Sequence, residues 1–228
     1  MSYLNGFFVF EGIDGVGKSS VASLVQEELN SRYQTDVFYW DKKDTSYKDN
    51  FATEQMTTIK QALWDYRKNA DISVMGDTHW LFLLASWFHA IDDILIRPAM
   101  RAKRSILMDS WHYKFSARYR LKKHFPPSLI DSAFGSLSIP NLVILLTVDS
   151  SYAADRKTGI FTPSECGVHD QPQLVGRDRF IAYQEKVQRQ LISELPENAT
   201  VHLDTTGLTL NEVVDKAVEI LSYRRTND

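Results

Sequence analysis

One motif near the N-terminus restricts the fold of this chain more than any other feature does. Residues 12–19 read G-x-x-x-x-G-K-S. They follow the apolar run Phe7–Phe10 and precede apolar residues at helical spacing, among them Val21, Val25 and Leu29. A strand, a glycine-rich turn and a helix start in this order form the context of a phosphate-binding P-loop. The segment therefore predicts an α/β domain that binds a nucleoside triphosphate.

The residue types in the motif explain how it would hold phosphate. Gly12, Gly15 and Gly17 permit a tight turn whose backbone N–H groups point inward, and the positive end of the following helix adds to the attraction for anions. Lys18 supplies a positive charge for the β and γ phosphates, and Ser19 offers a hydroxyl to Mg²⁺. We therefore expect ATP and Mg²⁺ as ligands.

Composition limits the alternatives. With 228 residues, of which 43% are hydrophobic and 24% charged, the chain suits a single domain over residues 1–228 with a sizeable core. A net charge of −3 argues against general nucleic-acid binding, which needs a basic surface. One cysteine, Cys166, permits no intrachain disulfide and suits the cytoplasm. Every long apolar run is interrupted by charge, so we expect no membrane span.

Strand-like and helix-like segments alternate along the chain, which favours a parallel sheet covered on both faces. We expect a three-layer P-loop NTPase fold with a five-stranded parallel sheet. The expected strands are Phe7–Phe10, Val37–Trp40, Ile106–Met108, Leu142–Val148 and Val201–Leu203. The expected helices are Lys18–Arg32, Ala52–Lys68, Thr78–Arg97, Pro127–Gly135, Ser151–Lys157, Asp178–Glu194 and Leu210–Arg224.

The helix expected from Thr78 is apolar on nearly every side. No charged residue occurs between Trp80 and Ala90. A helix of this kind is buried, or it gives one face to the core and another to a ligand or a partner. Core packing is the commonest use of such a stripe, and a pocket or a subunit interface remains the alternative.

A segment with glycines and prolines but no periodicity predicts a lid at about 157–177. Arg156 and Lys157 precede most of it, and Arg177 and Arg179 follow. Basic residues around a long irregular loop indicate closure over phosphates, and a lid arginine would neutralise charge on the transferring group. An ordinary surface loop is the alternative.

A second acidic position follows the third expected strand. Asp109 comes directly after Ile106–Met108. A carboxylate at this edge of a parallel sheet can hold Mg²⁺ through water or orient the acceptor. We therefore expect Ser19 and Asp109 to form the metal site. The chain has no N-K-x-D segment for reading guanine, which argues against a GTPase.

Several segments, in order along the chain, resemble the thymidylate kinase family of nucleoside monophosphate kinases. They are Phe10–Ser20, Ile96–Met100, Pro140–Asp149, Ala154–Lys157, Asp178–Phe180 with Tyr183 and Gln184, and Leu203–Thr206. The resemblance implies transfer of the γ-phosphoryl group of ATP to a nucleoside monophosphate, with Asp14 placing the acceptor and Thr205 near the adenine. It also implies a homodimer. The expected ATP-binding residues are Gly12, Ile13, Asp14, Gly15, Val16, Gly17, Lys18, Ser19, Ser20, Arg156 and Thr205.

The departures from the family concern the acceptor. The family usually has Asp-Arg-Tyr after the third strand, and this chain has Asp109-Ser110-Trp111, so the arginine that contacts the acceptor phosphate is absent. The expected acceptor residues are Asp14, Trp40, Lys42, Trp87, Phe88, Asp109, Ser110 and Trp111, with Tyr113, His89, His112 and Lys114 as further candidates. The expected catalytic residues are Lys18, Asp109, Arg156 and Asp14.

Two alternatives stay open at this point. The first keeps the fold and the donor but takes another small-molecule acceptor, such as a modified nucleotide, a nucleoside or a biosynthetic intermediate. The second is a non-catalytic nucleotide-binding regulatory protein, because one arginine of the family's active site is absent. The presence of Lys18, Asp109 and the lid arginines favours an enzyme.

Overall fold

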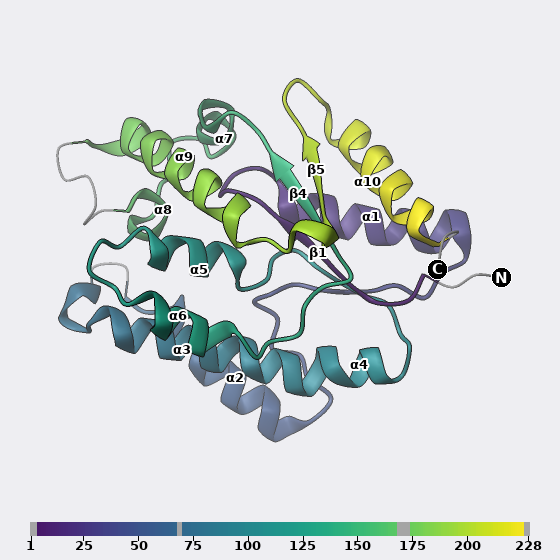
Figure 1. The fold of residues 1–228 in the computed structure, drawn as a ribbon, viewed down its shortest axis with the longest axis horizontal. Helices are drawn as coiled ribbons and strands as arrows, with labels where there is room; N and C mark the ends of the chain where they lie inside the picture. Colours follow the sequence, from purple (N-terminus) through teal and green to yellow (C-terminus); the bar gives the residue numbers. More distant parts are fainter. Residues whose placement is uncertain (1–3, 68–69, 168–173, 226–228) are drawn as a thin grey trace.

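A five-stranded parallel sheet forms the centre of the computed structural model, which describes residues 4–67, 70–167 and 174–225 (Figure 1). The strand order is β2-β3-β1-β4-β5, and each neighbouring pair is parallel. The strands are β1 (Phe7–Glu11), β2 (Phe38–Trp40), β3 (Ile106–Met108), β4 (Leu142–Thr147) and β5 (Thr200–Asp204). The predicted five-stranded parallel sheet is therefore confirmed. No strand end differs from the expected one by more than one residue.

Alternation along the central strands divides the core into two halves, because successive side chains of a strand point to opposite faces. On β1, Phe7 and Val9 pack with the helices that follow β2 and β3, whereas Phe8 and Phe10 pack with the first and last helices of the chain. Strands buried on both faces have near-continuous apolar runs, as β4 does with Leu142–Leu146. The three-layer arrangement is thus confirmed.

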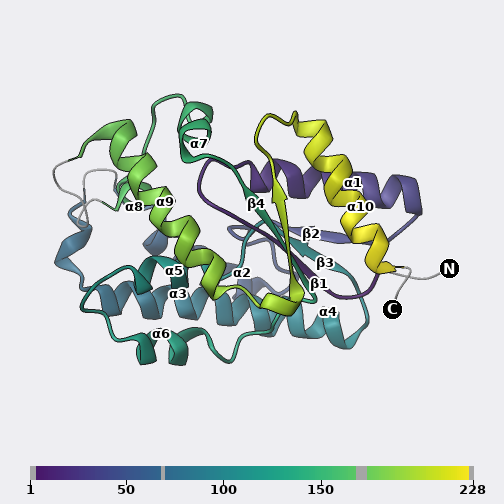
Figure 2. The same cartoon turned by 45° about the horizontal axis from the view of Figure 1, so that its top comes forward.

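Helices cover both faces of the sheet. The first and last helices lie side by side on one face, as Figure 2 shows. The α-helices are α1 (Lys18–Tyr33), α2 (Asn50–Leu63), α3 (Asp77–Ile91), α4 (Arg97–Arg101), α5 (Tyr113–Arg120), α6 (Pro127–Phe134), α7 (Ser150–Arg156), α8 (Pro163–Cys166), α9 (Gly176–Glu194) and α10 (Leu210–Arg225). The remaining helical segments are two 3₁₀ turns, Ile72–Val74 and Glu197–Ala199, and a π-helical turn, Asp92–Ile96.

Two differences from the expected helices affect the site. The helix expected over Ala52–Lys68 ends at Leu63, because Trp64 leaves helical geometry and its ring packs edge-on against Trp87 at a centroid distance of 4.9 Å. Lys68 itself lies outside the described residues. The sequence patterns also missed α5 altogether, and α5 supplies two cations to the site described below.

The long apolar helix runs without interruption from Asp77 to Arg101 through α3, the π-helical turn and α4. Within the described part of the chain, this helix alone is long and apolar enough to cross a membrane by length and composition. Asp92 and Asp93 interrupt its apolar run. For this reason the sequence, in which a membrane span was sought as a long apolar run without charge, did not indicate it. Leu81, Trp87 and Phe88 are buried in the core, and this packing accounts for its apolar character.

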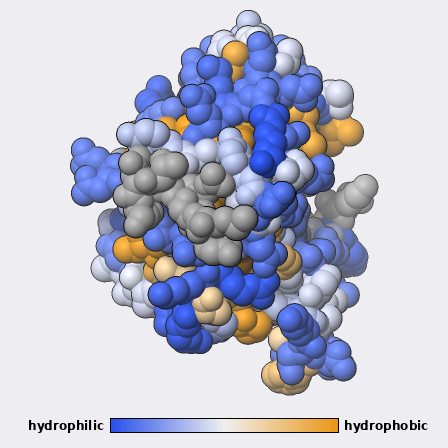
Figure 3. All heavy atoms as spheres, turned by 90° about the vertical axis from the view of Figure 1, so that its right-hand side faces the viewer, coloured by the Kyte–Doolittle hydropathy of each residue, from blue (hydrophilic) through white to orange (hydrophobic). Residues whose placement is uncertain are grey.

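Hydrophilic side chains predominate on the face at the right-hand side of Figure 1, which Figure 3 turns toward the viewer. Apolar residues are scattered over this face rather than gathered in one area. Single exposed apolar residues are normal on a globular domain, so this face gives no indication of a ligand site.

Candidate active site

The turn between β1 and α1 has the backbone that a phosphate loop requires. Gly12, Gly15 and Gly17 all have positive φ, at 147°, 82° and 102°. A Cβ atom on Gly12 would lie 2.4 Å from the Leu146 carbonyl oxygen, and one on Gly15 would lie 2.6 Å from the Ala153 carbonyl oxygen. Two of the three positions therefore need glycine for space as well as for φ.

Lys18 begins α1 and is buried under this turn. Its Nζ donates to the carbonyl oxygens of Gly12 at 3.0 Å and Ile13 at 2.7 Å. No ion pair of Lys18 occurs among the described residues. Burial and repulsion from Lys114 hold its pKa well below the ordinary value. Asp14 and Glu11 only partly offset these effects, so a bound phosphate would stabilise the charged form of this buried ammonium.

Ser19 and Asp109, the two residues expected at the metal site, are in contact. The Ser19 hydroxyl donates to Asp109 Oδ2, and Lys42 Nζ lies 2.9 Å from the same oxygen. The Lys42 backbone N–H donates to Asp109 Oδ1 at 3.0 Å. Burial raises the pKa of Asp109, but Lys42 and Ser19 outweigh it and the pKa lies below the ordinary value. An ionised carboxylate beside a hydroxyl is an oxygen donor set that fits Mg²⁺.

Asp14 connects the P-loop to α5 and α9. Its carboxylate accepts from Lys114 Nζ at 2.6 Å, from Arg118 and from Gln184 Nε2 at 3.2 Å. Its backbone N–H donates to Gln184 Oε1 at 3.0 Å. Burial raises the pKa of Asp14, but Arg118 and Lys114 together hold it well below the ordinary value. Asp14 is therefore a carboxylate fixed between two cations.

These groups surround one cavity of about 630 Å³, a size that suits small-molecule ligands. Its wall joins the P-loop, the loop after β2, α5 and α8. The cationic residues in its wall are Lys18, Lys42, Lys43, Lys114, Arg118 and Arg156, and the acidic ones are Asp14 and Glu165. Cations thus outnumber carboxylates in the described wall, as a site for phosphorylated ligands requires.

Three residues that were expected to bind ATP have side chains that do not face the cavity. The side chains of Ile13 and Val16 pack in the core beneath the turn, so only their backbones are available to phosphate. Ser20 lines the cavity with Ser19. Thr205 is buried, and its hydroxyl donates to the Thr147 carbonyl oxygen at 3.0 Å. Thr205 therefore ties β5 to β4, and it is not in the described cavity wall.

The aromatic residues that were expected to bind the acceptor do not line the cavity. Trp87, Phe88 and Trp111 are fully buried, and Trp40 is nearly so. None of the four belongs to the cavity wall as described. Their rings pack with the sheet; Trp111 stacks edge-on with Phe7 at 5.3 Å and with Phe88 at 5.2 Å. Periodicity in a sequence does not distinguish a pocket wall from a core.

Trp64, Tyr66 and Phe115 supply the aromatic part of the cavity wall instead. None of these three residues was expected at the site from the sequence. Trp87 acts on the site indirectly, because its Nε1 donates to the Lys42 carbonyl oxygen at 2.9 Å and so fixes the loop that carries Lys42.

Of the polar residues considered for acceptor binding, some line the cavity and others are buried in the core. Ser110 is buried, and its hydroxyl contacts the Glu11 carboxylate at 3.3 Å. His112 stacks on Phe134, and burial with the nearby His89 lowers the pKa of His112 to about 3. Lys114 alone among the further candidates is in the described cavity wall, since His89, His112 and Tyr113 are not.

The expected lid begins at the cavity. Arg156 at the end of α7 donates to the Val16 carbonyl oxygen at 3.0 Å, so it lies on the P-loop. Arg177 pairs with Asp155 at 2.8 Å on the surface. Between them α8 contributes Thr162, Ser164 and Glu165 to the cavity wall or its edge. Residues 168–173 of the expected lid lie outside the described residues.

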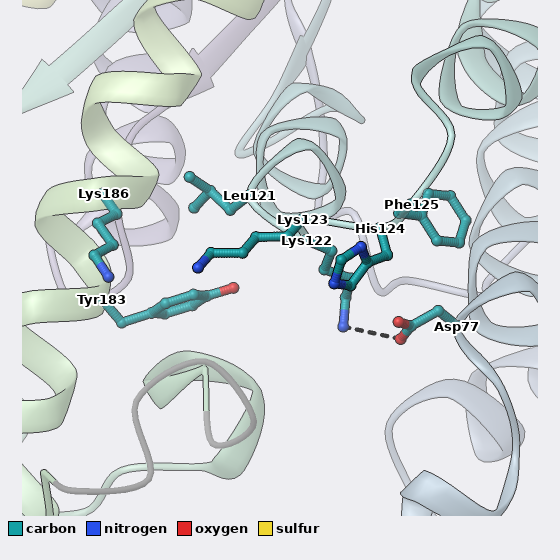
Figure 4. A pocket seen from close by; sticks show the side chains of 8 residues that line it. All are labelled: Asp77, Leu121, Lys122, Lys123, His124, Phe125, Tyr183 and Lys186. Atoms are coloured by element: carbon teal, nitrogen blue, oxygen red, sulfur yellow. Dashed lines mark ion pairs between the residues drawn. The ribbon is translucent and has the colours of Figure 1, made fainter.

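A second cavity of about 470 Å³ lies between the start of α3, the turn after α5, and α9 (Figure 4). In Figure 4, Lys122 points toward Asp77, and the two form an ion pair at 2.9 Å. Lys123 lies on the side of Tyr183. This cavity contains no P-loop residue. We therefore take the first cavity, which contains the P-loop and Asp14, as the candidate active site.

Comparison with known proteins finds similarity to thymidylate kinases over nearly the whole chain. No family model matches the sequence. A probable thymidylate kinase from Methanococcus vannielii is 26% identical over 221 residues, covering 93% of each chain. One from Methanococcus maripaludis is 23% identical over 218 residues, covering 96% of each chain. The solved thymidylate kinase of Candida albicans superimposes with a TM-score of 0.69 at 18% identity, covering 98% of this chain and 94% of that one.

The chain is therefore similar to probable thymidylate kinases in sequence and to a solved thymidylate kinase in fold. The similarity covers the P-loop, the sheet and the helices around the cavity, because it extends over nearly the whole chain. In this fold Asp14 and Arg156 line one cavity, and the buried Asp109 contacts Ser19 and Lys42 of its wall.

Proposed function

We propose that this protein is a nucleotide kinase that transfers the γ-phosphoryl group of ATP to a nucleoside monophosphate. One observation carries the proposal: the P-loop and a separate group of charged residues on α5 line the same cavity, with Asp14 between them. A donor held by the loop and an acceptor held beside Asp14 would have their reacting groups next to each other, and positioning is the main contribution of a protein to phosphoryl transfer.

Each group has a role that follows from its place. The turn at Gly12–Gly17 and Lys18 hold the triphosphate, and Lys18 follows the γ-phosphoryl group as charge develops on it. Ser19 and Asp109 would hold Mg²⁺, which supplies charge neutralisation between phosphates. Arg156 lies on the P-loop at Val16 and stabilises the transferring group. Asp14 orients the acceptor.

A different acceptor is the second candidate, and two observations favour it. Ser110 stands where the family has an arginine, and its hydroxyl is turned to Glu11 in the core. Trp87, which was expected to contact the acceptor, is fully buried. The second candidate is therefore the same fold and donor with another small-molecule acceptor, such as a modified nucleotide, a nucleoside or a biosynthetic intermediate.

One assay tests the function. The protein is incubated with ATP, Mg²⁺ and each of a panel of nucleoside monophosphates and nucleosides, and ADP is measured. We expect turnover with at least one monophosphate. Tight ATP binding with no turnover on any acceptor would favour the regulatory alternative.

The Lys18→Ala variant tests the mechanism in the same assay. It should abolish transfer, because the ammonium buried under the P-loop turn is removed, while the far-ultraviolet circular dichroism stays that of the wild type. Lys216→Ala, an exposed lysine on α10, is the matched control and should keep full activity. Unchanged turnover in Lys18→Ala would remove the mechanism.

A further inference from the structure

We propose that Lys114, with Arg118 beside it, is the specificity-determining residue that binds an anionic group of the acceptor. The proposal rests on the proposed function and names the class of acceptor: a phosphorylated small molecule rather than an uncharged nucleoside. It begins from α5, which the thymidylate kinase-like pattern did not mark as a source of charge.

Geometry places both cations on the cavity. Lys114 and Arg118 are four residues apart on α5, so they share one face of the helix. Both reach Asp14, with Lys114 Nζ at 2.6 Å from Oδ1 and Arg118 on Oδ2. The Lys114 side chain is only 5% exposed. Both residues also line the P-loop cavity.

Charge at this point does not balance. Three cations, Lys18, Lys114 and Arg118, face two carboxylates, Asp14 and the buried Glu11, and Lys114 repels the buried ammonium of Lys18. Glu165 also attracts Arg118, but it is paired with Lys157 at 2.7 Å. Excess charge away from water is costly unless a counter-ion offsets it. A phosphate would offset it, since the Lys114 ammonium has three N–H donors and Asp14 accepts one.

The other cations of the described cavity wall are engaged away from Asp14, and Lys18 donates to the carbonyl oxygens of Gly12 and Ile13. Lys42 is held by Asp109 at 2.9 Å. Lys43 lies over the Trp64 ring at 5.0 Å from its centroid. Arg156 lies on the P-loop, where the triphosphate of the donor binds. Lys114 and Arg118 are therefore the cations left for a second anion beside Asp14.

Position 110 cannot supply this charge. The Ser110 side chain is buried and turned to the Glu11 carboxylate. Lys114 follows one helical turn later in the chain, on the cavity side. The positive charge that selects an anionic acceptor thus sits on α5 in this protein instead of at the end of β3.

The test compares Lys114→Met, Lys114→Arg and Lys122→Met. Methionine keeps the length of lysine without its charge. Lys122 lies in the turn after α5 and pairs with Asp77 outside the site, so Lys122→Met is the matched control. For the best nucleoside monophosphate, we expect Lys114→Met to raise KM about 10- to 100-fold, as the loss of a hydrogen bond to a charged group implies. kcat and the KM for ATP should change less than about threefold. Lys114→Arg should keep most of the affinity, and Lys122→Met should match the wild type.

Calorimetric titration with the same monophosphate gives a readout that does not need turnover. Binding to Lys114→Met weakened at least about tenfold supports the proposal, and binding equal to that of the wild type overturns it. Faster turnover of nucleosides than of monophosphates by the wild type would overturn it as well, while leaving the kinase proposal in place. A wild type that turns over no acceptor contradicts the kinase proposal, and the titration then still decides the role of Lys114. Should Lys114→Met fail to fold, Lys114→Gln replaces it.

Discussion

At the scale of single residues, glycine is needed in the P-loop for two reasons: a positive φ and a lack of space for a Cβ atom. Gly15 and Gly17 both have positive φ. A Cβ atom on Gly15 would lie 2.6 Å from the Ala153 carbonyl oxygen, whereas one on Gly17 would meet nothing within 4 Å. A residue with a Cβ atom would therefore have a strained backbone at both positions. Of the two, only position 15 would also produce a steric clash.

Alanine substitutions should show this difference. Gly17→Ala should lower the free energy of unfolding by roughly 1–2 kcal/mol, the cost of a left-handed conformation for a residue with Cβ. Gly15→Ala should cost about 1–3 kcal/mol more, because the Ala153 carbonyl must move. Urea unfolding without nucleotide measures both. Equal costs would mean that the turn relaxes freely around residue 15.

Asp14 predicts a dependence of stability on pH. Because the folded protein holds its pKa well below the ordinary 3.8, the ionised carboxylate stabilises the fold above pH 3.8, and this contribution is lost as the pH falls through the folded-state pKa. Asp14→Asn leaves Lys114 and Arg118 without a counter-charge, so it should cost roughly 3 kcal/mol at neutral pH.

The comparison of Asp14→Asn with the wild type by denaturant unfolding at a series of pH values checks this expectation. The difference in unfolding free energy should be constant near neutrality and shrink below pH 3.8, the ordinary value for the group. A difference that stays the same down to strong acid would contradict the assigned role of the carboxylate.

At the scale of elements, some helices could be predicted from the sequence and others could not. The longer helices have an apolar period that a window of about 11–18 residues detects. α5 has eight residues, and Tyr113–Ala117 are all buried, so it has no alternating faces to detect. α8 has four residues. The element that carries Lys114 and Arg118 was therefore missed for lack of length and of an exposed face.

A buried carboxylate, Asp92, begins the π-helical turn in the long helix. Asp92 Oδ2 accepts from Arg97 Nε at 2.8 Å and from the Ser138 N–H at 3.1 Å. Its neighbour Asp93 is 66% exposed. A π-helical turn inside an α-helix needs such a local cause, and Asp92 joins this turn to the segment after α6.

Substitution of the two aspartates should therefore have unequal effects. Asp92→Ala should lower the free energy of unfolding by roughly 3 kcal/mol, because it leaves a buried N–H and a guanidinium without their acceptor. Asp93→Ala, the matched control, should change it by less than about 0.5 kcal/mol. Thermal unfolding measures both, and a harmless Asp92→Ala would show that the turn forms without this carboxylate.

At the scale of the whole molecule, the sheet divides the core into two halves and places the P-loop at one end of β1. The cavity forms where this end meets α5, α8 and the loop after β2. Cytoplasmic location and the absence of nucleic-acid and membrane partners stay predictions at this scale.

The homodimer implied by the family resemblance also stays a prediction. Phe82 on α3 is 51% exposed, and a subunit interface was one alternative that the sequence left open for the apolar helix. Analytical ultracentrifugation should give twice the 26.2 kDa mass of one chain, and Phe82→Glu should shift the equilibrium toward the monomer, since burying a charge in an interface is costly. A monomer at all concentrations would contradict the prediction, and a dimer unaffected by Phe82→Glu would place its interface elsewhere.

Local order in the sequence determined the strand, turn and helix around Gly12–Ser19 and the parallel sheet, because each depends on neighbouring residues and on a repeated period. The tertiary structure decided which side chains face the cavity. Asp14 meets Lys114 and Arg118 from about a hundred residues away, while Trp87 and Trp111 turn into the core. Burial and charge pairing depend on which surfaces of distant elements face each other, and no local pattern records that.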